Sequence, residues 1–194
     1  MILNDQQIIK LCEEQDMISP YERSQIRLVA GLKTVSYGLS SFGYDIRLSG
    51  KEFYTFRHIP GTIVDPKNFN PHNLSVSPLL HDEHGNYFVI PANSYGLGVA
   101  IEKLQIPKDV SVICMGKSTY ARCGIIANIT PAEAGWKGHL TLEFSNSSSA
   151  DCRIYANEGV VQLLFLQGKE CETSYSDRNG KYQDQPETVI VPRM

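Results

Sequence analysis

Hydrophobic positions near the start of the chain repeat with the spacing of a helix. Residues 4–7 suit a capping box at a helix start. Ile8, Leu11 and Cys12 then fall on one helical face, and Pro20 ends this pattern. One short N-terminal helix is therefore predicted.

From residue 34 onward the pattern changes to short apolar runs separated by turn-forming residues. Glycine, proline and asparagine recur between runs that are rich in Val, Ile, Tyr and Thr, as at residues 44–48, 52–56, 87–90 and 95–101. This frequency of turn signals predicts a barrel or sandwich of short strands, without parallel α/β alternation. The Asn-, Pro- and His-rich residues 66–85 are expected to form a long loop at the surface or at a subunit contact.

Two later runs have the clearest strand patterns. Residues 139–145 alternate with a period of two, which places the leucines and the phenylalanine on one face and Thr141 and Glu143 on the other. Residues 160–166 are typical of a buried strand interrupted by one polar residue, Gln162. From this pattern alone, Glu143 is an ordinary carboxylate facing solvent.

Size and composition predict one globular domain spanning residues 1–194. No apolar run approaches the ~18 residues of a membrane span, so we expect a cytoplasmic protein without a membrane partner. The formal net charge of -3 argues against nucleic acid as a partner. The five cysteines include no C-x-x-C pair, and their odd number favours reduced thiols over a disulfide framework.

The segment after the apolar run 110–115 is the first candidate for ligand chemistry. It reads GKST at residues 116–119 and continues to Arg122. Hydroxyls and turn amides can donate to phosphate, and the two cations supply charge. A P-loop is excluded because it would need glycine where the chain has Ser111. A polar turn that binds nothing is the alternative from these residues alone.

Ordered blocks across nearly the whole chain together resemble the dCTP deaminase family, within the larger group that includes the trimeric dUTPases. The blocks are SYGLSSFGYDIRL from residue 36, GKSTYARCG from residue 116, NITPAEAGWKGHLTLEFSN from residue 128, NEGVVQLLF from residue 157 and SYSDRNGKYQDQ from residue 174. The resemblance implies a mainly β fold, a distorted β-barrel or jelly-roll of the trimeric dUTPase type with a short N-terminal helix. It also implies a homotrimer with active sites at subunit interfaces.

The activity implied by the resemblance is hydrolytic deamination of dCTP to dUTP and ammonia, which feeds dUMP and dTTP synthesis. Such an enzyme is a hydrolase acting on a cyclic amidine C–N bond. The implied partners are dCTP and dUTP, with dTTP as a feedback inhibitor that no residue in the sequence requires. Mg2+ is expected to bind through the nucleotide phosphates, so no dedicated metal ligands are predicted.

Three residues match the family's catalytic groups. Glu143 matches the catalytic glutamate, and one semi-buried carboxylate can take a proton from water and return it to the pyrimidine and the leaving amine. Ser118 is expected to help hold the water, and Arg122 to orient the carboxylate. A structural ion pair at a subunit interface is the alternative for Arg122.

The implied nucleotide-binding set is larger. Lys117 and Thr119 suit phosphate oxygens, and a tail carrying Arg178 and Lys181 could close over a triphosphate. Without the resemblance, that tail would be read as a disordered end with solvated charges. The full set is Lys117, Ser118, Thr119, Tyr120, Ala121, Arg122, Thr141, Leu142, Glu143, Gln162, Tyr175, Lys181 and Gln185.

Zinc is not predicted. Most nucleobase deaminases carry H-x-E followed by P-C-x-x-C. Residues 81–83 match the first half, but the chain has no P-C-x-x-C to complete a zinc site. A metal-free deaminase must then rely on positioning and on Glu143.

The loop at residues 130–136 departs from better-known relatives, in which it is longer and carries I-D-P-G. Glu133 is the candidate replacement for the missing aspartate, and residues that read the base cannot be carried over here. A bifunctional enzyme that releases dUMP and diphosphate is therefore an alternative. A non-catalytic trimer that binds pyrimidine nucleotides is another, although binding alone needs no water-activating carboxylate.

Overall fold

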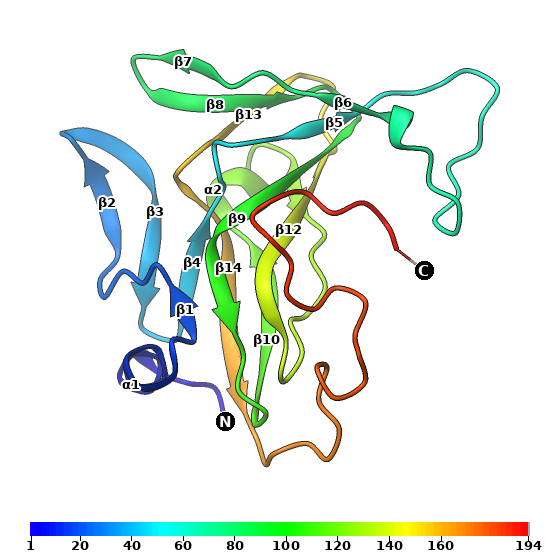
Figure 1. Ribbon diagram of the computed structural model, residues 1–194. Helices are drawn as coiled ribbons and strands as arrows, with labels where there is room; N and C mark the ends of the chain where they lie inside the picture. Colours follow the sequence, from blue (N-terminus) through cyan, green and yellow to red (C-terminus); the bar gives the residue numbers. More distant parts are fainter. Residues whose placement is uncertain (194) are drawn as a thin grey trace.

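The computed structural model describes residues 1–193, which form a mainly β fold with a short N-terminal helix (Figure 1). Helix α1 (Asp5–Gln15) starts with the predicted capping box, in which Asn4 and Gln7 exchange hydrogen bonds of 3.1 Å. Its three predicted apolar positions are buried. Within residues 1–193, none of the helices combines the length and hydrophobicity of a membrane span. The predicted fold class is confirmed.

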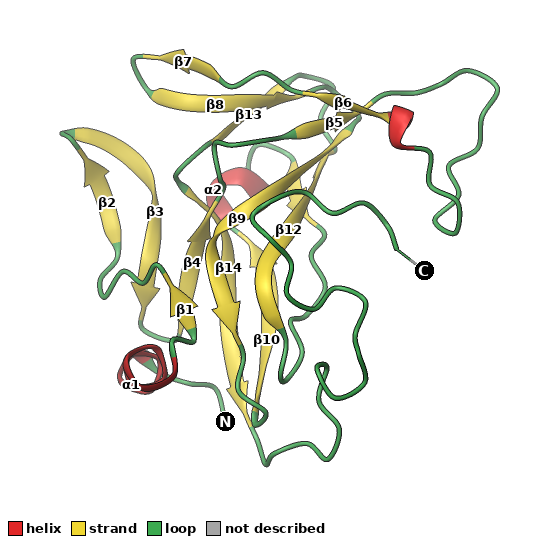
Figure 2. Ribbon diagram, in the orientation of Figure 1, coloured by secondary structure: helices red, strands yellow, loops and turns green. Residues whose placement is uncertain are grey.

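Strands make up three antiparallel sheets (Figure 2). The five-stranded sheet has the order β10-β14-β4-β3-β2 and contains β2 (Ile26–Val29), β3 (Leu32–Ser40), β4 (Gly43–Arg47), β10 (Val110–Gly116) and β14 (Gly159–Gln167). The six-stranded sheet has the order β11-β12-β9-β5-β6, with β1 also paired to β9. Its strands are β1 (Ile18–Ser19), β5 (Tyr54–Phe56), β6 (Leu74–Val76), β9 (Tyr95–Gln105), β11 (Ile125–Ala127) and β12 (Lys137–Asn146).

The smallest sheet has three strands in the order β13-β8-β7, namely β7 (Leu80–Asp82), β8 (Gly85–Ile90) and β13 (Cys152–Tyr155). Two single turns of helix complete the described elements, α2 (Ser118–Ala121) and the 3-10 helix η1 (Pro71–Asn73). Helix α2 directly follows β10, so the predicted anion-binding segment starts at the end of the five-stranded sheet.

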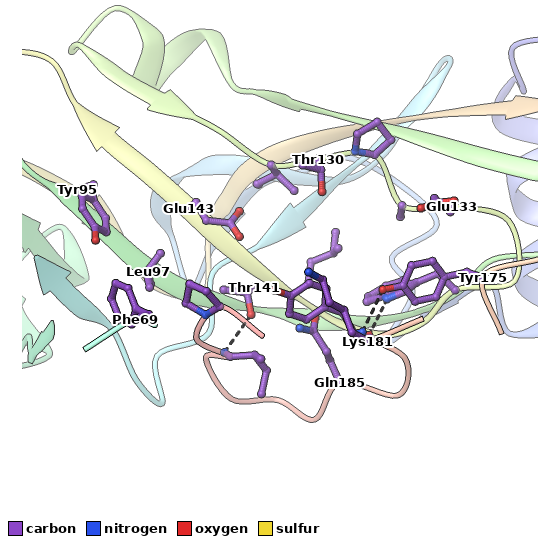
Figure 3. A pocket seen from close by; sticks show the side chains of 18 residues that line it. Phe69, Tyr95, Leu97, Thr130, Glu133, Thr141, Glu143, Tyr175, Lys181 and Gln185 are labelled. Atoms are coloured by element: carbon purple, nitrogen blue, oxygen red, sulfur yellow. Dashed lines mark hydrogen bonds between the residues drawn. The ribbon is translucent and has the colours of Figure 1, made fainter. Parts of the chain in front are cut away.

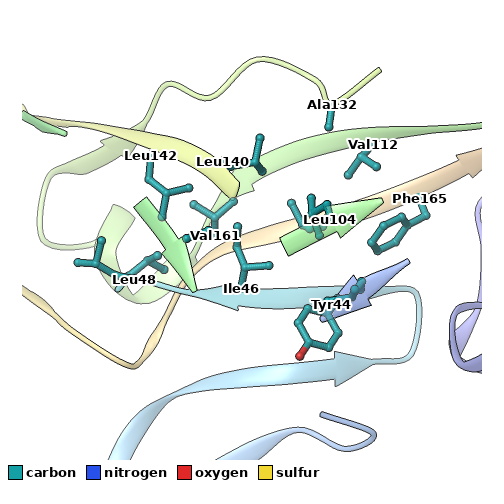
Figure 4. Packing of buried hydrophobic residues seen from close by; sticks show 14 of the residues in the cluster. Tyr44, Ile46, Leu48, Leu104, Val112, Ala132, Leu140, Leu142, Val161 and Phe165 are labelled. Carbon is teal, nitrogen blue, oxygen red and sulfur yellow. The ribbon is translucent and has the colours of Figure 1, made fainter. Parts of the chain in front are cut away.

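The hydrophobic core lies between the two larger sheets (Figure 4). Tyr44, Ile46 and Val161 enter it from the five-stranded sheet, and Leu104 and Leu142 enter it from the six-stranded sheet. All five side chains are completely or almost completely removed from solvent. Burial of this apolar surface holds the two sheets together and fixes how β12 lies relative to β14.

A buried ion pair also joins the two sheets. Arg47 Nε donates to Glu102 Oε1 at 2.7 Å, and the Arg47 amide donates to Glu102 Oε2 at 2.8 Å. A buried carboxylate is tolerated when such contacts satisfy it. Next to this pair, a single bridge between Leu48 and Ala100 connects the end of β4 to β9.

The structure corrects the predicted loop over residues 66–85. Helix η1 and strands β6 and β7 lie within it, and β7 pairs with β8. Strands β6 and β7 have only three residues each. Runs this short, set among turn-forming residues, do not supply the roughly four or more alternating positions from which a strand is predicted.

The last part of the chain packs against β12 and is not a solvated tail (Figure 1). The amide of His139 donates to the carbonyl of Gln185 at 3.0 Å, and the amide of Ile190 donates to Thr141 Oγ1 at 3.2 Å. Thr188 Oγ1 donates to Glu52 Oε1 at 2.6 Å. Residues 185–190 thus form a strap across the polar face of β12.

Candidate active site

A pocket of about 520 Å³ opens on the polar face of β12 (Figure 3). Thr141 and Glu143 line it from β12, and Tyr95 and Leu97 line it from β9. The segment 129–136, residues of the C-terminal segment between 175 and 192, Leu140 and Phe69 complete the walls. Most of these walls are aromatic or aliphatic, as is typical of a pocket that binds a small organic ligand.

Glu143 is placed in this pocket by the alternation of β12. Leu142 and Phe144 point into the core and are at most 1% exposed, so Glu143 points the other way. The register of the sheet sets Glu143 opposite Leu97. The amide of Asn128 donates to the carbonyl of Glu143 at 2.9 Å, which keeps the 128–136 loop beside the carboxylate.

Burial sets the acid–base properties of Glu143. Removal from water raises the pKa of its carboxyl group from 4.5 to about 7. Its Oε2 atom is buried and has no hydrogen-bond partner within residues 1–193. A carboxyl group with this pKa is present in both protonation states at neutral pH, so it can accept a proton and also donate one.

Part of the nucleotide-binding set predicted from the sequence meets Glu143 in this pocket. The phenol oxygen of Tyr175 accepts a hydrogen bond from the Tyr182 amide at 3.0 Å, and Lys181 Nζ donates to the Arg193 carbonyl at 2.9 Å. The predicted residues that line the pocket are Thr141, Glu143, Tyr175, Lys181 and Gln185. They come from β12 and from the C-terminal segment, more than thirty positions apart in the sequence.

Residues 117–122 of the predicted set do not line this pocket. Ser118 and Arg122 are both exposed, and Arg122 Nη1 donates to the Ser118 carbonyl at 3.1 Å. Tyr120 is instead buried, and its phenol oxygen accepts from the Tyr155 amide at 2.9 Å, which anchors α2 to β13. Thr119 and Ala121 are exposed on the same short helix. The three predicted catalytic residues are therefore not assembled within one chain.

Three further members of the set have their own surroundings. Lys117 forms an ion pair with Asp45, with 2.6 Å between Nζ and Oδ2. Gln162 lies on β14, where it is opposite Asp45, outside the pocket. The Leu142 side chain is completely buried in the core, so only its backbone could contact a ligand.

Several residues at the pocket were missed or assigned differently from the sequence. Tyr95 lies on a predicted strand, but a tyrosine there is also typical of packing. Phe69 and Ile190 were not predicted at the site. They reach the pocket through the folding of the 66–73 segment and of the strap, which no local sequence pattern indicates. Glu133, the candidate replacement for an aspartate, forms an ion pair with Arg178.

No group of three or more His, Cys, Asp or Glu residues that could hold a metal ion occurs within residues 1–193. His81, from the partial zinc motif, has Nδ1 2.9 Å from Asn86 Oδ1. All five cysteines are free thiols. The described residues thus offer no ready-made zinc site beside Glu143.

Comparison with known proteins identifies relatives over almost the whole chain. The family model described as dCTP deaminase-like matches residues 2–168. A dCTP deaminase of Francisella tularensis subsp. novicida (strain U112) is 51% identical over 185 residues, which cover 95% of this chain and 95% of that protein. The dCTP deaminase of Francisella philomiragia subsp. philomiragia is also 51% identical, with the same coverage.

Among solved structures, the crystal structure of 2'-deoxycytidine 5'-triphosphate deaminase from Agrobacterium tumefaciens has a similar fold. It matches with a TM-score of 0.59 and 20% sequence identity, over 86% of this chain. The matched region is 48% of that longer chain, so the present protein spans about half its length. At this identity the likeness concerns the fold.

Proposed function

The chain belongs to the dCTP deaminase-like family, and from this membership we propose that it hydrolyses dCTP to dUTP and ammonia. The observation that carries the proposal is Glu143, a half-buried residue at the pocket with a buried, unpaired Oε2 atom within residues 1–193 and a pKa of about 7. Four other residues that the resemblance assigns to the nucleotide line the same pocket.

Glu143 would act as the proton shuttle of this reaction. The ionised carboxylate takes a proton from the water that attacks C4 of cytosine. The protonated carboxyl gives this proton to the ring nitrogen N3 as the hydroxide bonds to C4. The carboxylate then takes the second water proton from the C4 hydroxyl and gives it to the amine, and the C4–N bond breaks to release ammonia and leave the C4 carbonyl. Burial supports this role because it brings the pKa of Glu143 close to neutral pH, where both transfers are possible.

We further propose that a homotrimer completes the site, with residues 117–122 of one copy facing Glu143 of another. Ser118 and Arg122 are exposed and free to meet a second copy. Exposed apolar side chains also lie close to them on strands at sheet ends: Ile113 (41%) and Met115 (49%) on β10, and Ile126 (51%) on β11. Apolar side chains on such strands favour burial against another chain.

Mg2+ would enter with the substrate. The triphosphate oxygens and water supply its ligands, so the protein need not provide a cage of carboxylates. Lys181 lies at the pocket, and Arg178 is held close by through its ion pair with Glu133. In this proposal both cations neutralise phosphate charge when the nucleotide binds. In this proposal dUTP passes to dUMP and dTTP synthesis, and dTTP inhibits by occupying the same groups.

The test is incubation of the purified protein with dCTP and Mg2+, followed by separation of the nucleotides and an ammonia assay. Equal amounts of dUTP and ammonia are the expected products. Release of dUMP and diphosphate would replace the proposal with the bifunctional reaction. Binding of dCTP without ammonia would identify a binding protein, and activity lost only after zinc removal would overturn the metal-free mechanism.

A further inference from the structure

A buried ion pair outside the pocket involves Lys117, which the resemblance assigns to phosphate. Its Nζ atom lies 2.6 Å from Asp45 Oδ2 and 3.2 Å from Ser36 Oγ. The side chains of Lys117 and Asp45 are only 11% and 2% exposed. The lysine is therefore held against two acceptors before any ligand arrives.

Asp45 lies on the face of β4 that points away from the core. Its neighbours Tyr44 and Ile46 both point into the core (Figure 4), so Asp45 points to the opposite side. There Gln25 Nε2 donates to Asp45 Oδ2 at 3.3 Å. The other oxygen, Oδ1, is buried and lacks a hydrogen-bond partner within residues 1–193. Ordinary structural carboxylates in a protein interior have their oxygens satisfied.

The register of the five-stranded sheet brings a second predicted nucleotide contact to the same place. Gln162 of β14 is directly opposite Asp45 of β4. Opposed residues of an antiparallel pair project from the same face of the sheet. Lys117 and Gln162 are 45 residues apart in the sequence, yet both lie beside Asp45 in the fold.

We infer that Asp45 is a positioning residue, which fixes Lys117 so that its ammonium group meets a phosphate oxygen of the nucleotide. An ammonium group has three N–H donors. Asp45 and Ser36 accept from two of them, and the third is left for the ligand. This inference rests on the proposed function and extends it to a residue outside the predicted set.

The burial of the pair explains why Lys117 would stay in place during binding. If the lysine swung away to follow a phosphate, it would leave the buried carboxylate of Asp45 without its charge partner, which is costly. A lysine that is already fixed also loses little rotamer freedom when the ligand binds. Asp45 should therefore act on nucleotide affinity and leave the chemical step at Glu143 unchanged.

The test compares Asp45→Asn, Lys117→Met and the double variant with the wild type. For Asp45→Asn we expect the KM for dCTP to rise about tenfold while kcat changes less than about twofold. In the Lys117→Met background, Asp45→Asn should change KM no further. Gln25→Ala is the matched control, because it removes the other donor to Asp45 without contacting Lys117, and its KM should stay at the wild-type value.

Two results would overturn the inference: a folded Asp45→Asn protein with wild-type KM, or losses that multiply in the double variant. Should Asp45→Asn fail to fold, Ser36→Ala takes its place. Its KM should rise about twofold when Lys117 is present and not at all with Lys117→Met. An unchanged KM for Ser36→Ala in the wild-type background would then overturn the inference.

Failure of the proposed function gives a different result. A wild-type protein that releases no ammonia from dCTP overturns the deaminase proposal and leaves the role of Asp45 to a binding measurement. Calorimetric titration of the same variants with dCTP measures the Kd and tests the role of Asp45 without turnover. A Kd that rises about tenfold in Asp45→Asn supports the inference, and an unchanged Kd overturns it.

Discussion

The resemblance assigns Glu143 on β12 and residues 117–122 after β10 to one site. In the fold, Glu143 lies in a pocket, whereas Ser118 and Arg122 lie on the surface. Glu143 is half-buried, its Oε2 atom is buried without a hydrogen-bond partner among residues 1–193, and its pKa is raised to about 7. Ser118 and Arg122 are exposed at the two ends of α2, a helix of only four residues, with Ser118 as its first residue and Arg122 directly after its last. The desolvation that raises the pKa of Glu143 suits proton transfer, but it lowers the free energy of unfolding when the carboxylate is ionised. The exposed side chains of Ser118 and Arg122 have no such cost. One chain therefore holds the acid–base group in its pocket, while the groups that the resemblance assigns to assist it lie elsewhere on its surface.

Glu143→Gln should have the largest effect, because an amide cannot accept the proton from water. We expect kcat to fall by about 10²–10⁴-fold, with dCTP binding retained. Ammonia release and calorimetric binding of dCTP measure the two quantities. Glu133→Gln, which alters a carboxylate at the same pocket that is already paired with Arg178, serves as the control and should lose far less. Wild-type turnover by Glu143→Gln would remove the role proposed for Glu143.

Mixing two inactive variants tests whether the two regions meet between copies. Glu143→Gln and Arg122→Gln are each expected to be inactive alone. In randomly mixed trimers made from equal amounts, roughly a quarter of the sites would combine an intact Glu143 with an intact Arg122 from a neighbour. Coexpression followed by ammonia assay measures the recovery. No recovery in a mixed trimer of confirmed composition would show that the two regions do not share a site.

The stability cost of Glu143 should depend on pH. Its pKa is raised by burial from 4.5 to about 7, so between these values the folded chain keeps a proton that the unfolded chain has lost. The free energy of unfolding therefore falls as pH rises through this window and stays lowered above it. At pH 8 we expect Glu143→Gln to be more stable than the wild type by about 1–3 kcal/mol, with little difference near pH 4. Thermal melts at both pH values check this, and an equal difference at both would contradict it.

The smallest effect is expected at the strap, which contributes Gln185 and Ile190 to the pocket that holds Glu143. Glu52 Oε1 accepts hydrogen bonds from Thr188 Oγ1 and from the Val189 amide. Glu52→Gln weakens these bonds by removing their charge, and we expect about a threefold rise in the KM for dCTP with kcat nearly unchanged. Faster proteolysis of the C-terminal segment should accompany it. Lys103→Gln, a charge change on an exposed position of β9, is the control for the loss of a surface charge. Unaltered proteolysis in Glu52→Gln would show that this carboxylate does not hold the strap.

Features that depend only on spacing along the chain were predictable from the sequence. The capping box predicted the start of α1, and the alternation over residues 139–145 predicted that Glu143 leaves the leucine face. The apolar run 160–166 likewise predicted a strand that became β14. Such local patterns suffice because adjacent residues in a strand must point to opposite faces.

The environments of these residues depend on the folding of distant segments against one another. Glu143 is half-buried because residues of β9 and of the 128–136 loop line the pocket beside it, and Lys117 meets Asp45 because β10 and β4 belong to one sheet. The polar tail became a strap through contacts with Thr141 and Glu52. Burial and charge pairing depend on which distant segments come into contact, and local sequence patterns do not specify those contacts. The pKa of Glu143 and the order of Lys117 are therefore products of the fold.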